Sequence, residues 1–329
     1  MKQKIALVLG ATGGIGNAMA KTLMQRGWQV RALHRRADQM VAKERSGNLS
    51  DSLANGIVWR QGDAMHEQDV IAAAEGVDII VHAVNPPGYR NWAQLVMPMI
   101  ENSIAAARVS GARIVFPGTV YNYGPDALPG LSETSPQNPV TRKGAIRAQM
   151  ERRLQLASQS GVRTLVVRAG DFFGPHLANS WFSQGLVKPG QPVTTVTYPG
   201  QRGIGHQWAY LPDVAETMMQ LIEREDALAS FDTFHMNGHW DADGTQMVAA
   251  IGRVTGQPGL KAKSFPWWLL PLASPFVPLF RELREVSYLW RRPVRLDNHR
   301  LLKLLGSEPH TALDEAVKAT LTGIGCLKT

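Results

Sequence analysis

Apolar and polar residues follow two alternating patterns along the first 170 residues. Short, nearly continuous runs rich in valine and isoleucine are typical of strands buried on both faces. The longer segments between them carry apolar residues at helical spacing, and this alternation predicts an α/β fold with a doubly wound parallel sheet. The predicted strands are Lys4–Leu9, Gln29–Leu33, Ile57–Gln61, Asp78–His82, Arg113–Pro117 and Arg163–Arg168, and the predicted helices are Asn17–Arg26, Glu67–Glu75 and Met97–Ser110.

The pattern loosens after Gly174, where residues 175–206 are rich in proline and glycine and are predicted to be loop-like. A helix at Pro212–Glu225 and a strand at Thr233–Asn237 then indicate a return to the sheet. We expect a first domain over residues 1–174 and about 207–237, and a smaller, discontinuous C-terminal lobe over about 175–206 and 238–329.

The composition narrows the class of protein. The 329 residues include one cysteine, Cys326, which cannot form an intrachain disulfide, so a cytoplasmic protein is predicted. The longest apolar stretch, Phe265–Phe280, carries four prolines and is expected to form a pocket wall or partner surface rather than a membrane span. The nine histidines lack a metal-ligand spacing, so no metal is expected; the nearest case is His235 and His239.

A glycine-rich turn follows the first predicted strand, where residues 4–16 read KIALVLGATGGIG. Glycines let the backbone approach a pyrophosphate, and the N-terminus of the following helix offers unpaired N–H groups and a favourable dipole. The turn therefore predicts a dinucleotide-binding domain, the alternative being a glycine-rich turn without a ligand. The residues expected to hold the cofactor here are Gly10, Thr12, Gly13, Gly14, Ile15 and Gly16.

The second predicted strand ends in His34, Arg35 and Arg36. Sites that prefer NAD place an acidic residue here for the ribose 2′-hydroxyl, whereas a guanidinium suits a 2′-phosphate. We therefore predict NADP(H) in preference to NAD(H), bound first by Arg35 and then by Arg36. The alternative is a solvated basic turn.

The charge agrees with a phosphate-bearing ligand. The chain has a net charge of +8, and residues 1–165 hold 19 basic against 12 acidic side chains. Such a bias fits either nucleic acid or a small anion. Because the basic residues are scattered and no nucleic-acid-binding motif is present, we expect a small-molecule cofactor and no nucleic-acid partner.

Further motifs follow in order along the chain. They read GDA at 62–64, HAV at 82–84, FPGT at 116–119 with NYG at 122–124, RAGDFFGP at 168–175 and WAYLPDVA at 208–215. With GATGGIG, these segments resemble the extended short-chain dehydrogenase/reductase family in its epimerase/dehydratase-like branch. The resemblance spans about residues 1–240.

The resemblance implies a Rossmann-type sheet, a C-terminal lobe that binds substrate, and a homodimer. It also implies roles for individual residues. Thr119 takes the position of the catalytic serine or threonine, and the remaining matches lie beside the cofactor: Asp63 and Ala64 at the adenine, Ala83, Val84 and Asn85 after the fourth strand, and Gly170 facing the nicotinamide.

One departure from the family concerns the catalytic pair. The family's Tyr-x-x-x-Lys motif is absent, because no tyrosine in this chain has a lysine four residues later. In the surrounding frame, Lys143 occupies the tyrosine position and Arg147 the lysine position. Residues four apart share one face of a helix. Arg147 is expected to hold the nicotinamide ribose, since its guanidinium has five donors but stays cationic.

The proton donor is therefore open between several side chains. Burial and the charge of Arg147 would lower the pKa of Lys143 and make it a proton donor. The alternative is a degraded site with a solvated basic helix. Tyr123 and Tyr121 are rival donors, although packing or substrate contact is favoured for both.

Three functions are compatible with these residues. The first is an NADP(H)-binding oxidoreductase with a non-standard proton donor, acting on a small, moderately apolar carbonyl or hydroxyl compound. The second is an NADP(H)-sensing regulatory protein without turnover, and the third is an NAD(P)-dependent epimerase or isomerase. Aromatic residues that would form an apolar substrate wall are Trp181, Phe182, Trp267, Trp268 and Trp290.

Overall fold

The computed structural model describes residues 3–46, 56–86, 92–177, 180–269 and 285–328. The chain forms two compact units, each assembled from separate stretches of sequence. Unit 1 comprises Met1–Gly118, Gln149–Val167 and Val214–Phe234. Unit 2 comprises Thr119–Ala148, Arg168–Asp213 and His235–Thr329.

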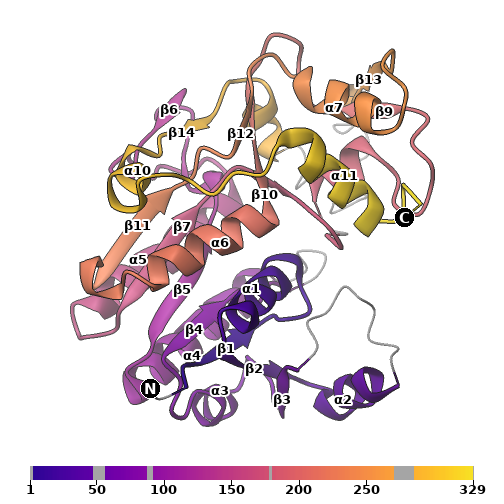
Figure 1. Cartoon of the computed structure of the whole chain (residues 1–329). Helices are drawn as coiled ribbons and strands as arrows, with labels where there is room; N and C mark the ends of the chain where they lie inside the picture. Colours follow the sequence, from indigo (N-terminus) through magenta and orange to yellow (C-terminus); the bar gives the residue numbers. More distant parts are fainter. Residues whose placement is uncertain (1–2, 47–55, 87–91, 178–179, 270–284, 329) are drawn as a thin grey trace. The chain divides into compact units, whose positions relative to one another are not determined.

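Unit 1 is built on a seven-stranded sheet with the order β11-β7-β5-β4-β1-β2-β3 (Figure 1). The pairs β1–β2, β2–β3, β1–β4 and β4–β5 are parallel. The winding of the chain reverses between β1 and β4, which is the arrangement of a Rossmann-type fold. The strands are β1 (Ile5–Leu9), β2 (Gln29–His34), β3 (Val58–Gln61), β4 (Ile79–His82), β5 (Arg113–Gly118), β7 (Thr164–Arg168) and β11 (Phe231–His235).

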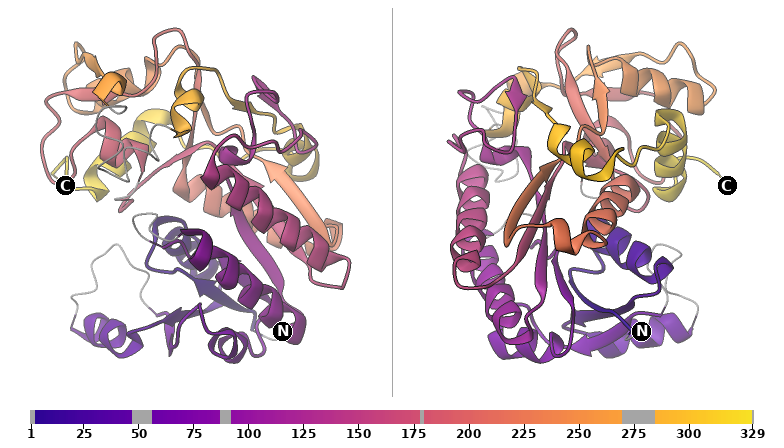
Figure 2. Two further views of the ribbon diagram at one scale, coloured as in Figure 1. Left: turned by 180° about the vertical axis from the view of Figure 1, so that it is seen from behind. Right: turned by 60° about the vertical axis from the view of Figure 1, so that its left-hand side comes forward.

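Helices cover both faces of this sheet. Figure 2 shows α1 and α6 on one face and α4 with the C-terminal half of α5 on the other. Helix α1 buries Met19, Ala20 and Leu23, which helical spacing brings to one side. The helices are α1 (Gly14–Gln25), α2 (Ala37–Arg45), α3 (Glu67–Ala73), α4 (Trp92–Ser110), α5 (Arg142–Ser158) and α6 (Leu211–Ile222).

The predicted α/β class and the predicted strands of the sheet are confirmed, with shifted ends. Helix α4 begins at Trp92, five residues before the predicted start at Met97. Trp92 and Val96 are both buried, so packing extends the helix even though Pro98 lies within it. Strand β11 ends at His235 rather than Asn237, because Gly238 turns the chain with a φ of +55°.

The described residues of unit 2 form three small sheets, ordered β12-β10-β8, β13-β9 and β14-β6. The residues predicted as a loop at 175–206 include a one-turn π-helix at Phe182–Leu186 and the strand β9, so that prediction holds only in part. Helix α7 packs against α11 through apolar side chains such as Ile251 and Val317. The strands are β6 (Gly130–Leu131), β8 (Asp171–Phe173), β9 (Val196–Tyr198), β10 (His206–Tyr210), β12 (His239–Asp241), β13 (Ala262–Ser264) and β14 (Arg295–Leu296), and the helices are α7 (Gln246–Val254), α10 (His299–Leu305) and α11 (Leu313–Gly323).

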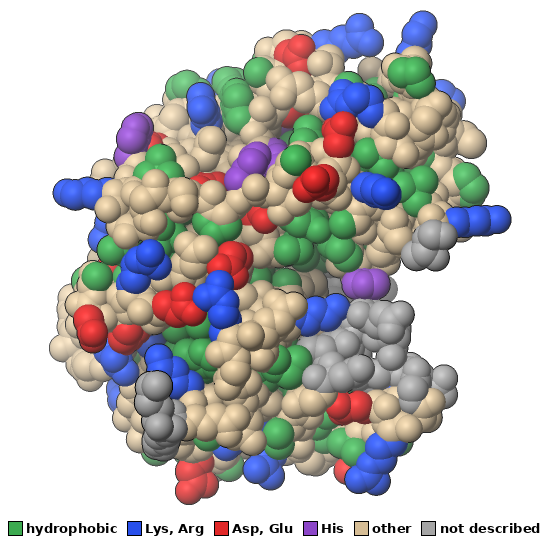
Figure 3. Space-filling view, viewed as in Figure 1, with side chains coloured by type: hydrophobic (Ala, Val, Ile, Leu, Met, Phe, Trp, Pro, Cys, Tyr) green, Lys and Arg blue, Asp and Glu red, His purple; other side chains and the backbone are tan. Residues whose placement is uncertain are grey.

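Two surface properties bear on the choice of partner. Among the described residues, no helix is long and apolar enough to cross a membrane. The stretch Phe265–Phe280 lies outside the described residues from position 270 onward. On the face shown in Figure 3, lysine and arginine side chains are scattered among other residues rather than gathered in one patch.

Candidate dinucleotide and catalytic site

The glycine turn lies at the carboxyl ends of β1 and β4, within unit 1. Gly10 has a φ of +87°, and a Cβ atom placed on it would come within 2.6 Å of the Ala83 carbonyl oxygen. A Cβ atom on Gly16 would come within 2.1 Å of the Gly10 carbonyl oxygen. Both positions therefore require glycine, and the turn is closely packed against Ala83 and Val84 at the point where the winding of the sheet reverses.

The turn leads directly into helix α1. Gly13 precedes the helix, its N–H donates to the Gly10 carbonyl over 2.9 Å, and no side chain of the described residues caps the first turn. That turn also contains no acidic residue. An uncapped helix start without negative charge fits a phosphate group, because its N–H groups and dipole both favour an anion.

The basic turn after β2 is fixed by Gln61 of β3. The Gln61 amide donates to the Arg35 carbonyl over 2.7 Å and accepts from the Ala37 N–H over 3.0 Å. Both Arg35 and Arg36 have exposed side chains. Burial lowers the pKa of His34, whose Nδ1 accepts from the Arg36 N–H over 3.1 Å. The turn thus presents two guanidinium groups beside a neutral imidazole.

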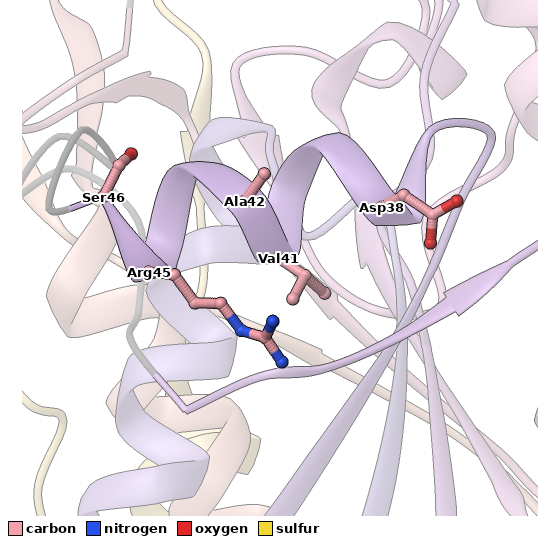
Figure 4. A pocket seen from close by; sticks show the side chains of 5 residues that line it. All are labelled: Asp38, Val41, Ala42, Arg45 and Ser46. Atoms are coloured by element: carbon pink, nitrogen blue, oxygen red, sulfur yellow. The ribbon is translucent and has the colours of Figure 1, made fainter.

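A surface hollow of about 690 Å³ lies along α2, which follows this turn (Figure 4). Its lining among the described residues is Asp38, Val41, Ala42, Arg45 and Ser46, all from the helix or its end. None of these is a residue predicted to bind the cofactor. The hollow therefore adds no side chain to the dinucleotide site.

The other predicted cofactor residues of unit 1 are held by hydrogen bonds. The Asp63 carboxylate accepts from the Met65 N–H over 3.0 Å, and the Ala64 carbonyl accepts from Asn102 over 2.8 Å. Asn85 follows β4, and its side-chain oxygen accepts from the Trp92 indole over 2.8 Å. These contacts fix the loops after β3 and β4. The resemblance places the first loop at the adenine and the second beside the cofactor.

The predicted catalytic residues Thr119, Lys143 and Arg147 all belong to unit 2. A Cβ atom on Gly144 would come within 2.1 Å of the Tyr121 carbonyl oxygen, so the first turn of α5 lies directly against residues 119–123. Lys143 is only 8% exposed, and Arg147 is half-buried one turn later. The Thr119 hydroxyl donates to the Asn122 side chain over 3.3 Å. The fold thus brings the helix that carries Lys143 beside the segment that carries Thr119.

Tyr123 takes part in a buried network that sequence reasoning did not identify. Its hydroxyl lies 3.2 Å from Nε2 of His235, and Nε of Arg168 lies 3.2 Å from the same nitrogen. Nδ1 of His235 lies 3.2 Å from the Leu131 carbonyl oxygen, which can only accept a hydrogen bond. Nδ1 therefore carries the proton of the ring, and Nε2 is the acceptor. Burial, followed by the charge of Arg168, lowers the pKa of His235 to about 3.

Arg168 connects this network to Thr119. Its guanidinium donates to the Thr119 carbonyl over 2.5 Å and lies over the Tyr123 ring, 5.0 Å from the ring centre. Gly170 follows two residues later, and a Cβ atom there would come within 2.2 Å of the Gln207 carbonyl oxygen. The motif RAGDFFGP was the one sequence signal that pointed to this network, because its arginine is Arg168, which is fully buried.

Histidines and acids do not form a metal centre in the part of the chain that the structure describes. His235 belongs to the network above, and His239 lies on β12 with its ring 4.4 Å from that of His310. Burial, followed by the charge of His310, lowers the pKa of His239 to about 4.

Similarity to known proteins extends over most of the chain. Residues 6–236 match the NAD dependent epimerase/dehydratase family. Protein YeeZ of Escherichia coli (strain K12) is 26% identical over 191 residues, which are 57% of this chain and 65% of YeeZ, just under two thirds of its length. A 2-alkyl-3-oxoalkanoate reductase of Stenotrophomonas maltophilia (strain K279a) is 27% identical over 185 residues, about half of each chain.

A solved structure shows the same fold. The UDP-glucuronic acid 4-epimerase of Bacillus cereus, in complex with UDP-glucuronic acid and NAD, superposes with a TM-score of 0.74 at 15% identity. The superposition covers 97% of this chain and 98% of that one. Together with the glycine turn, the strand order and the match over residues 6–236, this shows that the chain belongs to the NAD dependent epimerase/dehydratase family.

Proposed function

We propose that this protein is an NADP(H)-dependent reductase of small, moderately apolar carbonyl compounds, which also oxidises the corresponding alcohols. The observation that supports it most directly is the close approach of Gly144 to the Tyr121 carbonyl. This contact holds the helix turn of buried Lys143 next to the segment of Thr119, so a cationic side chain in the family's tyrosine position lies beside the hydroxyl that the family keeps.

The choice of NADP(H) rests on the turn after β2. Its guanidinium groups, Arg35 and Arg36, suit the 2′-phosphate through charge-assisted hydrogen bonds, and no carboxylate ends β2 to hold a free 2′-hydroxyl. The pyrophosphate is assigned to the glycine turn and the start of α1, whose first turn has no side-chain cap among the described residues and no acidic side chain. When bound, the nicotinamide supplies or accepts the hydride.

Each catalytic candidate receives one task. The Thr119 hydroxyl hydrogen-bonds the substrate oxygen. Lys143 places its ammonium at the same oxygen, where it stabilises developing negative charge and is a candidate proton donor. Arg147 holds the nicotinamide ribose through its several N–H donors, and it does not exchange protons because a guanidinium remains cationic.

The substrate class follows from the aromatic residues of unit 2 and from the relatives. Trp181 lies with ring centres 5.1–6.2 Å from those of Trp290, Trp267 and Phe265. Such a cluster suits an alkyl or aryl group better than a sugar. The name of the reductase relative specifies an alkyl-substituted oxo acid, which is a substrate of this chemical kind.

A second candidate is an NADP(H)-sensing protein without turnover. It is favoured by one observation, the replacement of the tyrosine and lysine of the usual motif by Lys143 and Arg147. It predicts tight dinucleotide binding and no reaction with any carbonyl compound.

One experiment separates these functions. The purified protein is titrated with NADPH and NADH and then assayed with NADPH against panels of ketones, 2-alkyl-3-oxo acids, aldehydes and enones. We expect NADPH to bind more tightly than NADH. We also expect NADPH to be oxidised in the presence of at least one compound from the panels. Tighter binding of NADH contradicts the cofactor assignment, and binding without turnover in every panel favours the sensor.

Three variants test the residue assignments. Lys143→Ala is expected to lower kcat by about 100-fold or more, the usual scale for loss of a group that acts on the reacting oxygen. Lys188→Ala removes an exposed lysine of the same unit and is the matched control. Turnover lost in Lys143→Ala and kept in Tyr123→Phe supports Lys143, whereas unchanged turnover in Lys143→Ala removes it from the mechanism.

A further inference from the structure

A second histidine in unit 2, His206, forms a buried pair with Asp171. Nε2 of His206 lies 2.9 Å from Oδ2 of Asp171, and the two residues come from the neighbouring parallel strands β10 and β8. His206 is 6% exposed, and the Asp171 side chain is 13% exposed. A contact of this length between a buried imidazole and a carboxylate is a strong, directional hydrogen bond.

The His206 ring is also held on its faces. It stacks on Trp290 with ring centres 3.7 Å apart and planes 10° apart. Trp208 packs edge-on at 4.9 Å. With a carboxylate at one ring nitrogen, Trp290 stacked on one face and Trp208 against the ring edge-on, the imidazole has little freedom to rotate.

The hydrogen bond also determines which nitrogen carries the proton in the neutral ring. A carboxylate only accepts hydrogen bonds, so Nε2 is protonated and Nδ1 keeps a lone pair. No residue in the described ranges hydrogen-bonds to Nδ1, in contrast to His235, where both nitrogens have partners. An imidazole that is oriented by a carboxylate and has its other nitrogen available is the arrangement of a general acid or base.

Asp171, one member of the pair, lies close in sequence to Arg168, which contacts the segment of Thr119. Asp171 follows Gly170 directly and stands three residues after Arg168, which donates to the Thr119 carbonyl. Three residues of extended chain span at most about 10 Å. The backbone of Asp171 therefore lies within about 10 Å of that of Arg168, and both residues belong to the same unit as Thr119.

We propose that His206 is the proton donor of the reaction and that Asp171 is its positioning residue. This inference rests on the proposed reductase function. The Nδ1–H of the His206 imidazolium would give its proton to the carbonyl oxygen, and bound NADPH would supply the hydride for the carbonyl carbon. The products are the alcohol, the oxidised cofactor and neutral His206, which regains a proton from solvent.

The other candidates fit this step less well. Histidine is the side chain that most often transfers protons in enzymes. Lys143 then acts as the cation that stabilises the oxygen. The Tyr123 hydroxyl faces the acceptor nitrogen of His235, so its proton is already in a hydrogen bond.

Two carboxylates of the described residues lie beside His206. Asp171 faces it from β8, and Asp241 is its register partner on β12. The Asp241 carboxylate accepts from the Gln246 and Met247 N–H groups over 3.1 and 3.0 Å, at the start of α7. Asp171 is therefore the carboxylate bound to the His206 ring.

The test uses a matched pair of histidine–aspartate contacts. His206→Gln and Asp171→Asn change the buried pair, and His299→Gln changes an exposed one, in which Nδ1 of His299 lies 2.5 Å from Asp297. The variants are assayed with NADPH and the best carbonyl substrate from about pH 5 to about pH 9. We expect kcat to fall by about 100-fold or more in His206→Gln and by about tenfold or more in Asp171→Asn, with His299→Gln unchanged.

The pH profile gives a readout that a purely structural role does not change. The pH profile of the wild type should contain a limb that His206→Gln lacks, because a glutamine side chain cannot transfer a proton to the substrate. Unchanged kcat with an unchanged profile in His206→Gln overturns the proposal while leaving the reductase function intact. No turnover by the wild type overturns the reductase function and the role of His206 with it.

A measurement without substrate tests the pair itself. In ¹⁵N NMR of the histidine-labelled protein at alkaline pH, with His206 assigned by the His206→Gln spectrum, we expect a protonated Nε2 and a bare Nδ1. Asp171→Asn should disturb this tautomer. A proton found on Nδ1 instead overturns the assignment of the reacting nitrogen.

Discussion

The Tyr123 hydroxyl lies 3.2 Å from Nε2 of His235, and both side chains are fully buried. His235 directs its other nitrogen to the Leu131 carbonyl, so the tyrosine is the donor in this contact. The phenol proton is thus engaged within the core of unit 2. This hydrogen bond indicates that Tyr123 supports the fold and does not exchange its proton with a substrate.

The first prediction concerns this tyrosine. Tyr123→Phe keeps the ring but removes the hydroxyl, so we expect turnover within about twofold of wild type and a loss of about 1 kcal/mol in the free energy of unfolding. Steady-state assays and urea unfolding measure the two quantities. A loss of turnover as large as that of Lys143→Ala would show instead that Tyr123 acts on the substrate.

The second prediction concerns acid sensitivity. Burial and Arg168 lower the pKa of folded His235 to about 3, while an unfolded histidine titrates near 6.5. The unfolded chain therefore binds more protons between these values, and this histidine's contribution to stability falls as the pH drops from about 6.5 towards 3. The expected slope is about 1.4 kcal/mol per pH unit.

The check is a comparison of wild type with His235→Gln by urea unfolding at several pH values. The destabilisation caused by His235→Gln should be largest near neutral pH and shrink as the medium becomes more acidic. A difference that stays constant with pH would mean that His235 titrates equally in the folded and unfolded chains.

The third prediction concerns cofactor choice. Arg35→Ala and Arg36→Ala remove guanidinium groups next to the expected 2′-phosphate, so Kd for NADPH should rise by about tenfold or more while Kd for NADH changes little. Arg152→Ala, an exposed arginine on α5, is the control and should alter neither. Equal weakening of both dinucleotides would place the arginines away from the 2′-phosphate.

The fourth prediction compares two glycines with positive φ. Gly10→Ala introduces a Cβ atom 2.6 Å from the Ala83 carbonyl, whereas the same change at Gly27, with a φ of +78°, meets no atom within 4 Å. We expect Gly27→Ala to cost about 1 kcal/mol in stability and to bind NADPH normally. Gly10→Ala should lower the free energy of unfolding by clearly more than Gly27→Ala and should abolish NADPH binding. Equal effects of the two substitutions would show that the turn at Gly10 accommodates a Cβ atom without a change in the site.

The fifth prediction concerns a buried cation of unit 1. Arg113 is 2% exposed and donates to Glu225 over 2.8 Å and to the Ala229 carbonyl over 2.9 Å. Arg113→Met leaves the Ala229 carbonyl without this donor, while Arg163 still pairs with Glu225, and it should lower the free energy of unfolding by about 1–3 kcal/mol. Arg253→Met breaks the exposed pair with Asp314 and should cost no more than about 1 kcal/mol.

The sequence by itself determined the architecture of unit 1. Nearly continuous apolar runs such as Arg113–Pro117 can only be strands buried on both faces, and glycines at positions 10, 13 and 16 after the first of them specify the turn. These signals are local, because burial of a strand and the approach of a backbone depend on residue type at a few adjacent positions. The same holds for Arg35 and Arg36, whose exposure follows from their place after β2.

Only the tertiary structure decided which polar side chains meet. Tyr123 and His235 are 112 residues apart, and Asp171 and His206 are 35 apart on strands whose pairing no spacing rule gives. His235 and His239 come nearest to a metal-ligand spacing in the sequence, and the turn at Gly238 separates the hydrogen-bond network of His235 from the ring contact between His239 and His310. Hydrogen bonds between distant strands depend on register and packing, which are global properties, and they fix the tautomers and proton positions on which the chemistry rests.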